Sequence, residues 1–190
     1  MKKCLLFALL FCCVANAHAL TITVLPSESQ LTVGDFFHVD IIADIAQSES
    51  VIGWGLDFSF DQTLLSLSAP PTINTALWRQ IYAADGDGLA AALPSFLSPA
   101  VYGEDLLLAT LTMEAIDAGF SSLGISYTAS DRREGFSRKT GFVTNIQYIQ
   151  AAVEVSAPTA PVPEPATIGL LGMGLMGLAC VARKRKTRNL

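Results

Sequence analysis

An alternation of apolar and polar residues constrains the fold of this chain more than any other feature. It is clearest at residues 37–41, 56–60 and 107–115, where every second residue is apolar. Successive side chains of a β-strand point to opposite faces, so a segment of this kind buries one face and exposes the other. In the last segment, Leu107 is expected on the buried face and Leu108 on the exposed face. The chain is therefore expected to form sheets that are covered on one side.

Weaker strand patterns fill most of the remaining chain, and turn-forming residues separate them. These strands are expected at residues 21–25, 64–68, 89–96, 122–127, 141–148 and 151–155. About nine short strands without an amphipathic helix between them indicate an all-β fold, an antiparallel jelly-roll sandwich. Residues 74–83 are the one stretch that could form a helical turn.

The N-terminal 19 residues have the three parts of a secretory signal peptide. Lys2 and Lys3 supply the positive charge, residues 4–14 are apolar, and Ala17 and Ala19 provide the small residues that signal peptidase requires. The apolar run is too short to span about 30 Å of hydrocarbon, so we expect it to be removed. The alternative is a buried N-terminal helix of the fold.

The C-terminal region combines a linker, an apolar segment and a basic end. Residues 157–161 are a proline-rich linker, and residues 166–182 contain no charge. As a helix, these 17 residues would measure about 25 Å, the lower limit for a transmembrane span. The basic residues Arg183, Lys184, Arg185 and Lys186 open a cluster over residues 183–188. Positive charge would hold this end in the cytoplasm before processing, so the domain would lie outside. The segment is either a permanent anchor or a temporary membrane stop.

The domain between these ends, residues 20–156, has no cysteine and a strongly acidic balance. All four cysteines lie in the terminal segments, so no disulfide is expected in the domain. Residues 20–161 contain 16 acidic and five basic residues, a formal charge of −11. This charge disfavours binding to nucleic acid and to anionic lipid. Cations, neutral glycans and basic proteins are still possible ligands. The five basic residues, of which the last four are expected in a solvated loop around Gly135, are Arg79, Arg132, Arg133, Arg138 and Lys139.

Few residues of the domain suit catalysis or metal binding. His38 is the only histidine beyond the signal peptide, and the alternation places it on an exposed strand face. No Gly-x-Ser-x-Gly motif accompanies it, so no catalytic residue and no firm cofactor are predicted. Asp85 and Asp87 lie in a glycine turn and are weak calcium candidates. The alternative for these two residues is a plain acidic turn.

The two tryptophans are the residues best suited to stack on a sugar ring. Trp54 shares its strand face with Leu56 and Phe58, so we expect it in the core. Trp78 lies in a less regular stretch and is a weak candidate for contacting a ligand.

The C-terminal motif resembles a known sorting signal. Val162, Pro163, Glu164 and Pro165 precede a glycine-rich apolar run and then a basic end, as in the PEP-CTERM signal. The resemblance covers residues 162–190 and implies a Gram-negative bacterium with an exosortase that recognises the Pro-Glu-Pro motif. It also implies that the protein is exported through the inner membrane to the envelope, the cell surface or an exopolysaccharide matrix.

The domain resembles the cohesins, jelly-roll sandwiches that are related to carbohydrate-binding modules. The matching stretches are residues 33–40, 55–61, 64–65, 107–112 and 118–119. Gln62 stands where a proline is common in that family. Cohesins bind dockerins through one exposed sheet face, and relatives bind polysaccharide.

The cohesin resemblance therefore implies a non-catalytic binding domain, with a dockerin-like protein or a polysaccharide as its ligand. Two rival hypotheses stay open at this point. One is a secreted hydrolase that acts on polysaccharide, and the other is a purely structural component of an exopolysaccharide matrix.

Overall fold

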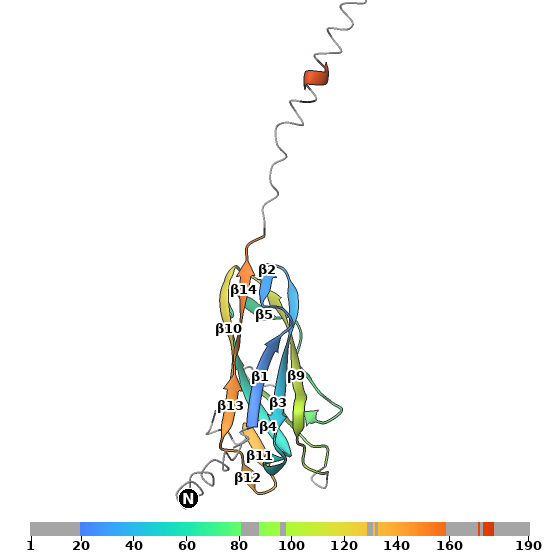
Figure 1. Cartoon of the computed structure of the whole chain (residues 1–190), viewed down its shortest axis with the longest axis vertical. Helices are drawn as coiled ribbons and strands as arrows, with labels where there is room; N and C mark the ends of the chain where they lie inside the picture. Colours follow the sequence, from blue (N-terminus) through green and yellow to red (C-terminus); the bar gives the residue numbers. More distant parts are fainter. Residues whose placement is uncertain are drawn as a thin grey trace, which may run out of the picture. The chain divides into compact units, whose positions relative to one another are not determined.

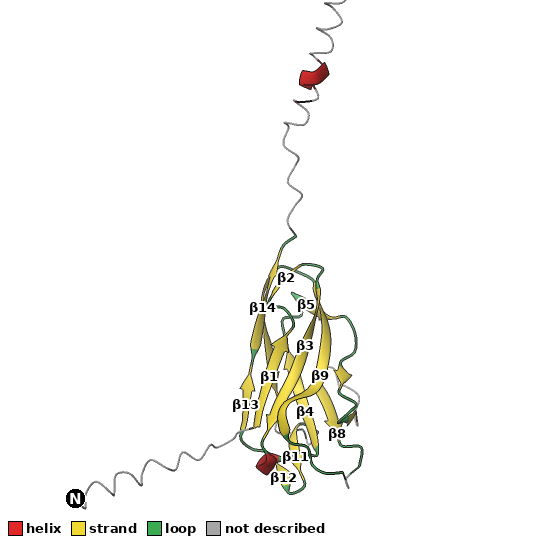
Figure 2. Cartoon of the chain, turned by 45° about the vertical axis from the view of Figure 1, so that its right-hand side comes forward, coloured by secondary structure: helices red, strands yellow, loops and turns green. Residues whose placement is uncertain are grey.

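The computed structural model describes residues 20–80, 88–95, 98–128, 131, 133–158, 171 and 173–176. The chain divides into two units, Met1–Ala157 and Pro158–Leu190. The first unit contains a two-sheet β-sandwich (Figure 1; Figure 2). In the second unit, residues 171 and 173–176 are helical.

One sheet, called sheet 1 here, contains the two longest strands of the described chain. Its strands follow the order β13-β1-β3-β9-β5, and β6 also pairs with β9. Figure 1 shows β13, β1, β3 and β9 side by side in this order. The strands are β1 (Leu20–Pro26), β3 (Phe36–Ile45), β5 (Leu65–Leu67), β6 (Thr72–Ile73), β9 (Gly103–Ala115) and β13 (Ile146–Ile149).

The other sheet, sheet 2, is built around the central strand β4. The strands β10 and β11 pair with successive parts of β4, while β8 pairs with β4 and β7. Beyond β10 the order continues through β14 to β2, and β12 pairs with β11. The strands are β2 (Gln30–Thr32), β4 (Gly53–Ser59), β7 (Arg79–Gln80), β8 (Gly88–Ala92), β10 (Gly119–Ser126), β11 (Gly135–Arg138), β12 (Gly141–Phe142) and β14 (Ala151–Ser156).

The alternation in the sequence is realised in the longest strand pair. On β3, Phe37, Val39 and Ile41 are almost completely buried, while His38 between them is exposed. Their partners on β9 are also inward-facing, and the two inner faces of the sandwich form one apolar core. The all-β sandwich predicted from the sequence is confirmed.

The strand pairing differs from the prediction at the ends of the domain. Two pairs are parallel, β1 with β13 and β14 with β2, so the sandwich is not purely antiparallel. The predicted strand over residues 141–148 is divided into β12 and β13, which belong to different sheets. β12 pairs with its neighbour along the chain, β11, whereas β13 pairs with the distant strand β1. The long-range pairing of β13 overrides a local pattern that reads as one strand.

The basic loop expected around Gly135 is only partly a loop: residues 135–138 form strand β11, whereas Arg133 and Lys139 lie in turns on either side of it. Phe136 on this strand is fully buried opposite Trp54, and this burial explains why the segment joins the sheet. Arg138 ends the strand and forms an ion pair with Glu49 at 2.6 Å. At residues 74–78, a single turn forms in which the N–H of Trp78 donates to the carbonyl of Asn74.

Among the described residues, no helix is both long enough and apolar enough to cross a membrane. The membrane-spanning helix predicted over residues 166–182 is therefore not confirmed, and most of this range lies outside the described residues.

Candidate functional site

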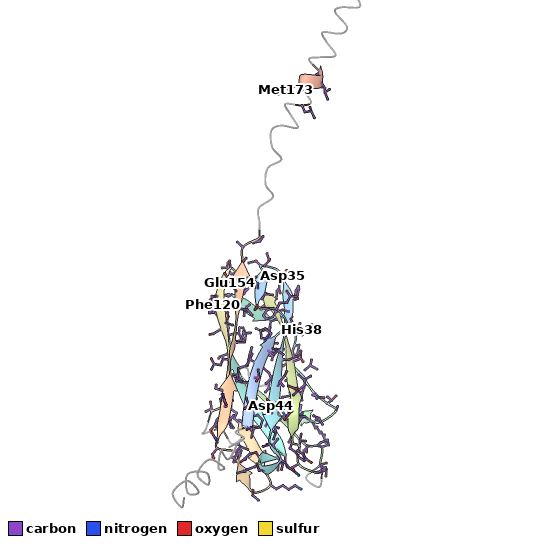
Figure 3. All side chains as sticks on the ribbon, viewed as in Figure 1. Asp35, His38, Asp44, Phe120, Glu154 and Met173 are labelled. Carbon is purple, nitrogen blue, oxygen red and sulfur yellow. The ribbon has the colours of Figure 1, made fainter. Side chains whose placement is uncertain are left out.

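The candidate site is the outer face of sheet 1, which we call the acidic face. It consists of the outward side chains of three adjacent strands, β1, β3 and β9. Figure 3 shows His38 and Asp44 on β3. Its main members are Thr21, Thr23, Leu25, Phe36, His38, Asp40, Ile42, Asp44, Leu107, Thr110, Thr112 and Glu114.

Hydrogen bonds between β3 and β9 hold polar side chains in place on this face. The Thr110 hydroxyl donates to the Asp40 carboxylate at 2.6 Å. In the neighbouring pair, Thr112 Oγ1 lies 3.3 Å from Nδ1 of His38. Nearer the other end of β3, the N–H of Asp105 donates to the Asp44 carboxylate at 2.8 Å. The polar groups are therefore fixed by rigid strands rather than by loops.

A β-bulge adds apolar side chains to the middle of the acidic face. Ile41 pairs with Ala109 and Ile42 with Leu107, so Leu108 is an extra residue on β9. Leu108 is buried, whereas Leu107 lies opposite the half-buried Ile42. The expectation that Leu107 is buried and Leu108 exposed is wrong, because a bulge reverses the alternation beyond it.

Charge is distributed unequally between the two sheets. The strands of sheet 1 contain five acidic residues and no lysine or arginine. The strands of sheet 2 contain two acidic and two basic residues, so their formal charges cancel. The five acidic residues of sheet 1 are Asp40, Asp44, Glu104, Asp105 and Glu114.

A hollow of about 540 Å³ lies at one end of the acidic face. Its acidic side chains are those of Asp44, Glu104 and Asp105. Within the described ranges, no group of three or more His, Cys, Asp or Glu side chains could hold a metal ion. The hollow extends the acidic face beyond Asp44. It is also lined by Thr21, Ile45, Ala46, Gln47, Tyr102 and Gly103.

The outer face of sheet 2 is less open at its centre. A Cβ added at Gly55 would overlap the backbone carbonyl of Arg133, which shows that the segment near residue 133 covers this part of β4. Farther along this sheet, Phe120 is 69% exposed and lies opposite Glu154 (Figure 3). The two outer faces therefore differ in access as well as in charge.

Both tryptophans lie in the core. Trp54 is 2% exposed, as predicted, and Trp78 is 1% exposed. Their rings meet edge to face, with centroids 6.3 Å apart and an interplanar angle of 88°. The interpretation of Trp78 as a ligand-stacking residue is not supported, because its buried ring offers no face to a ligand in solvent.

Several predicted site residues lie outside the described residues. These are the signal-cleavage residues Ala17 and Ala19, the calcium candidates Asp85 and Asp87, the Val162–Pro165 motif, and the basic residues 183–188. They stay predictions from the sequence. His38 is exposed on β3, as the alternation predicts.

The sequence reasoning did not identify the acidic face. The sequence shows that these strands contain no lysine or arginine, but only the strand pairing shows that they belong to the same sheet. The same holds for Ile42 and Leu107, whose contact depends on the bulge.

The comparisons with known proteins address the two units separately. Residues 161–186 match the PEP-CTERM protein-sorting motif. The chain carries a PEP-CTERM sorting motif. This motif implies exosortase-dependent export to the cell envelope or surface. Among curated proteins, none matches this chain.

The sandwich is similar to solved cohesin structures. The cohesin module of a family 33 glycoside hydrolase from Clostridium perfringens has a TM-score of 0.57 at 12% identity, covering 74% of this chain and 98% of that module. The third ScaC cohesin of Acetivibrio cellulolyticus, in complex with the ScaB dockerin, has a TM-score of 0.54 at 12% identity, with coverages of 72% and 98%. A non-cellulosomal cohesin from Archaeoglobus fulgidus gives 0.53 at 12% identity, with coverages of 73% and 91%. The sandwich therefore has a cohesin-like fold.

Proposed function

We propose that this PEP-CTERM protein is an exported, non-catalytic binding protein whose cohesin-like sandwich recognises another protein at the cell envelope or surface. The observation that carries the proposal is the cohesin-like fold, which matches nearly the whole length of the solved cohesin modules. The ScaC cohesin was solved in complex with a dockerin, so a dockerin-like protein is the first partner class to consider.

The surface of the sandwich supports a protein ligand more than a sugar. Flat sheet faces with fixed polar groups and a few apolar side chains suit protein–protein contact. Both tryptophans of this chain, the residues expected to stack on a sugar ring, are in the core. A polysaccharide ligand and a purely structural role are the alternatives that an experiment must separate from the proposal.

The sorting tail supports a two-stage route to the envelope in this proposal. The apolar segment over residues 166–182 holds the chain in the inner membrane, with its basic end in the cytoplasm. Exosortase then acts at the Pro163-Glu164-Pro165 motif, so membrane attachment through this segment is temporary.

The proposal is tested on the processed protein purified from its native host. A panel of dockerins, a panel of glycans and a reducing-sugar assay would be run on the same preparation. We expect saturable binding to at least one dockerin-like protein and no sugar release. Polysaccharide turnover would instead establish the hydrolase hypothesis, and binding only to glycans would contradict a protein ligand.

A further inference from the structure

We infer that the acidic face of sheet 1 is the docking surface, and that its partner is a protein with a basic surface of lysine and arginine residues. This inference rests on the proposed function, because it assigns a face and a partner chemistry to the binding domain. It is carried by charge complementarity, by the apolar side chains on the face and by their rigid placement.

The first step is the charge of the face. Five carboxylates belong to the strands of sheet 1, and no lysine or arginine does. The described cations of the domain lie on other segments, and two are held by carboxylates of their own. Arg138 pairs with Glu49 at 2.6 Å and Arg133 with Asp131 at 3.3 Å. The acidic face therefore keeps a single sign of charge, which attracts a basic partner and repels an acidic one.

The second step explains why the expected partner is a protein rather than a free cation. Exposed apolar side chains lie beside the carboxylates: Leu25, which pairs with Asp40, is 51% exposed, and Phe36, which pairs with Glu114, is 64% exposed. On the adjacent strand β13, Ile149 is 43% exposed opposite Thr23. An aromatic and two aliphatic side chains on a flat surface gain from burial against another protein, not from binding an ion. In the described part of the chain, no three His, Cys, Asp or Glu side chains lie close enough together to hold a metal ion.

The third step concerns preorganisation. Asp40 and Asp44 each accept a hydrogen bond from β9, at 2.6 Å and 2.8 Å. Their carboxylates are therefore held in position before any partner arrives, so binding costs little additional side-chain entropy. A basic protein surface can pair with such fixed carboxylates without first ordering them.

The assigned face can be tested by photo-crosslinking in the native host. Phe36 and Phe120 form a matched pair, because they are 64% and 69% exposed on the outer faces of sheets 1 and 2. Each would be replaced in turn by the photo-crosslinking residue p-benzoylphenylalanine, and crosslinked peptides identified by mass spectrometry. We expect position 36 to crosslink to a protein through a peptide rich in lysine and arginine, and position 120 to give at most background.

The partner identified in this way then serves as the probe for the charge. The triple variant Asp40→Asn, Asp44→Asn and Glu114→Gln removes three charges from the face, and the amide oxygens can still accept the β9 hydrogen bonds. The control Glu28→Gln, Asp117→Asn and Glu154→Gln removes three charges from other exposed positions. We expect the triple variant to slow association roughly tenfold or more, and the control to slow it far less. Raising the salt concentration should slow association of the unmodified protein in the same way.

The outcomes distinguish this inference from the proposed function. Crosslinking from position 120, alone or as strongly as from position 36, would overturn the assigned face but leave a protein-binding role intact. Association that is insensitive to salt, or crosslinking to an acidic peptide, would overturn the basic partner. If neither position crosslinks to any protein, the assigned face is overturned, and the dockerin and glycan panels decide the proposed function. Salt dependence is measured on the unmodified protein, so the charge test stands even if the triple variant does not fold.

Discussion

The hydroxyl of Thr110 donates a hydrogen bond of 2.6 Å to the carboxylate of Asp40 across the β3–β9 pair. This bond joins two outward-facing side chains, so it stabilises the surface of sheet 1 rather than the core. It also fixes Asp40, one of the five acidic residues in the strands of sheet 1. The energetic value of the contact can be measured independently of any partner.

Replacing Thr110 should weaken the domain modestly. In Thr110→Val the shape of the side chain is kept and the hydrogen bond to Asp40 is lost, so the free energy of unfolding should fall by about 1 kcal/mol. Thr112→Val is the matched control, because Thr112 makes only a 3.3 Å contact with His38. Urea denaturation of both variants decides the question, and equal effects would contradict the expected ranking.

Replacing Trp78 should destabilise the domain strongly. Its ring is 1% exposed and packs against Trp54, so Trp78→Ala should lower the free energy of unfolding by about 3–5 kcal/mol. Phe120→Ala removes an aromatic ring that is 69% exposed and should change it by less than about 0.5 kcal/mol. A mild effect of Trp78→Ala in the same urea titration would argue against its place in the core.

Gly55 should not tolerate a side chain. A Cβ at this position would overlap the carbonyl oxygen of Arg133, so Gly55→Ala must displace that segment at a cost of about 1–3 kcal/mol. At Gly53 the nearest atom to an added Cβ is the Ser137 hydroxyl oxygen at 3.0 Å, so Gly53→Ala should cost less. Hydrogen exchange should show faster exchange around residue 133 in Gly55→Ala only. Unchanged exchange there would count against the covering contact.

Tyr148 should make the domain less stable at alkaline pH. Burial raises the pKa of its phenol above the ordinary value, and Tyr127 and the Asp57 carboxylate add to the rise. Above about pH 10 the unfolded chain loses this proton while the folded chain keeps it, so stability falls as the pH rises. In Tyr148→Phe, the melting temperature should fall less between neutral and alkaline pH than it does in the unmodified protein. Identical pH profiles for the variant and the unmodified protein would contradict the shift.

The sorting tail should be removed in the native host. We expect cleavage near Pro163–Pro165, which would leave a protein without Cys180 and without the basic cluster at residues 183–188. Intact-mass measurement of envelope protein tests this directly. Replacing Pro163, Glu164 and Pro165 with alanine should leave the tail in place, because the recognition motif is lost. A permanent anchor predicts the opposite, namely the full mass and unchanged localisation in both proteins.

The sequence alone was sufficient for the features that depend on local order. The alternation identified the buried residues of β3 and the core position of Trp54, because successive side chains of any strand point to opposite faces. The sorting motif was also readable, because such a signal is a linear arrangement of a short motif, an apolar run and a basic end. None of these features requires knowledge of which segments meet in space.

Only the tertiary structure decided how the strands are shared between the two sheets. Leu20 pairs with Ile146 in parallel, and residues 141–148 are divided between the sheets. The bulge at Leu108 leaves Leu107 half-buried on the outer face, and the burial of Trp78 likewise depends on distant segments. Backbone hydrogen bonds between strands do not depend on which side chains the strands carry. The pairing of strands is therefore determined by the packing of the whole core. The same packing gathers five carboxylates on one sheet and leaves lysine and arginine out of its strands.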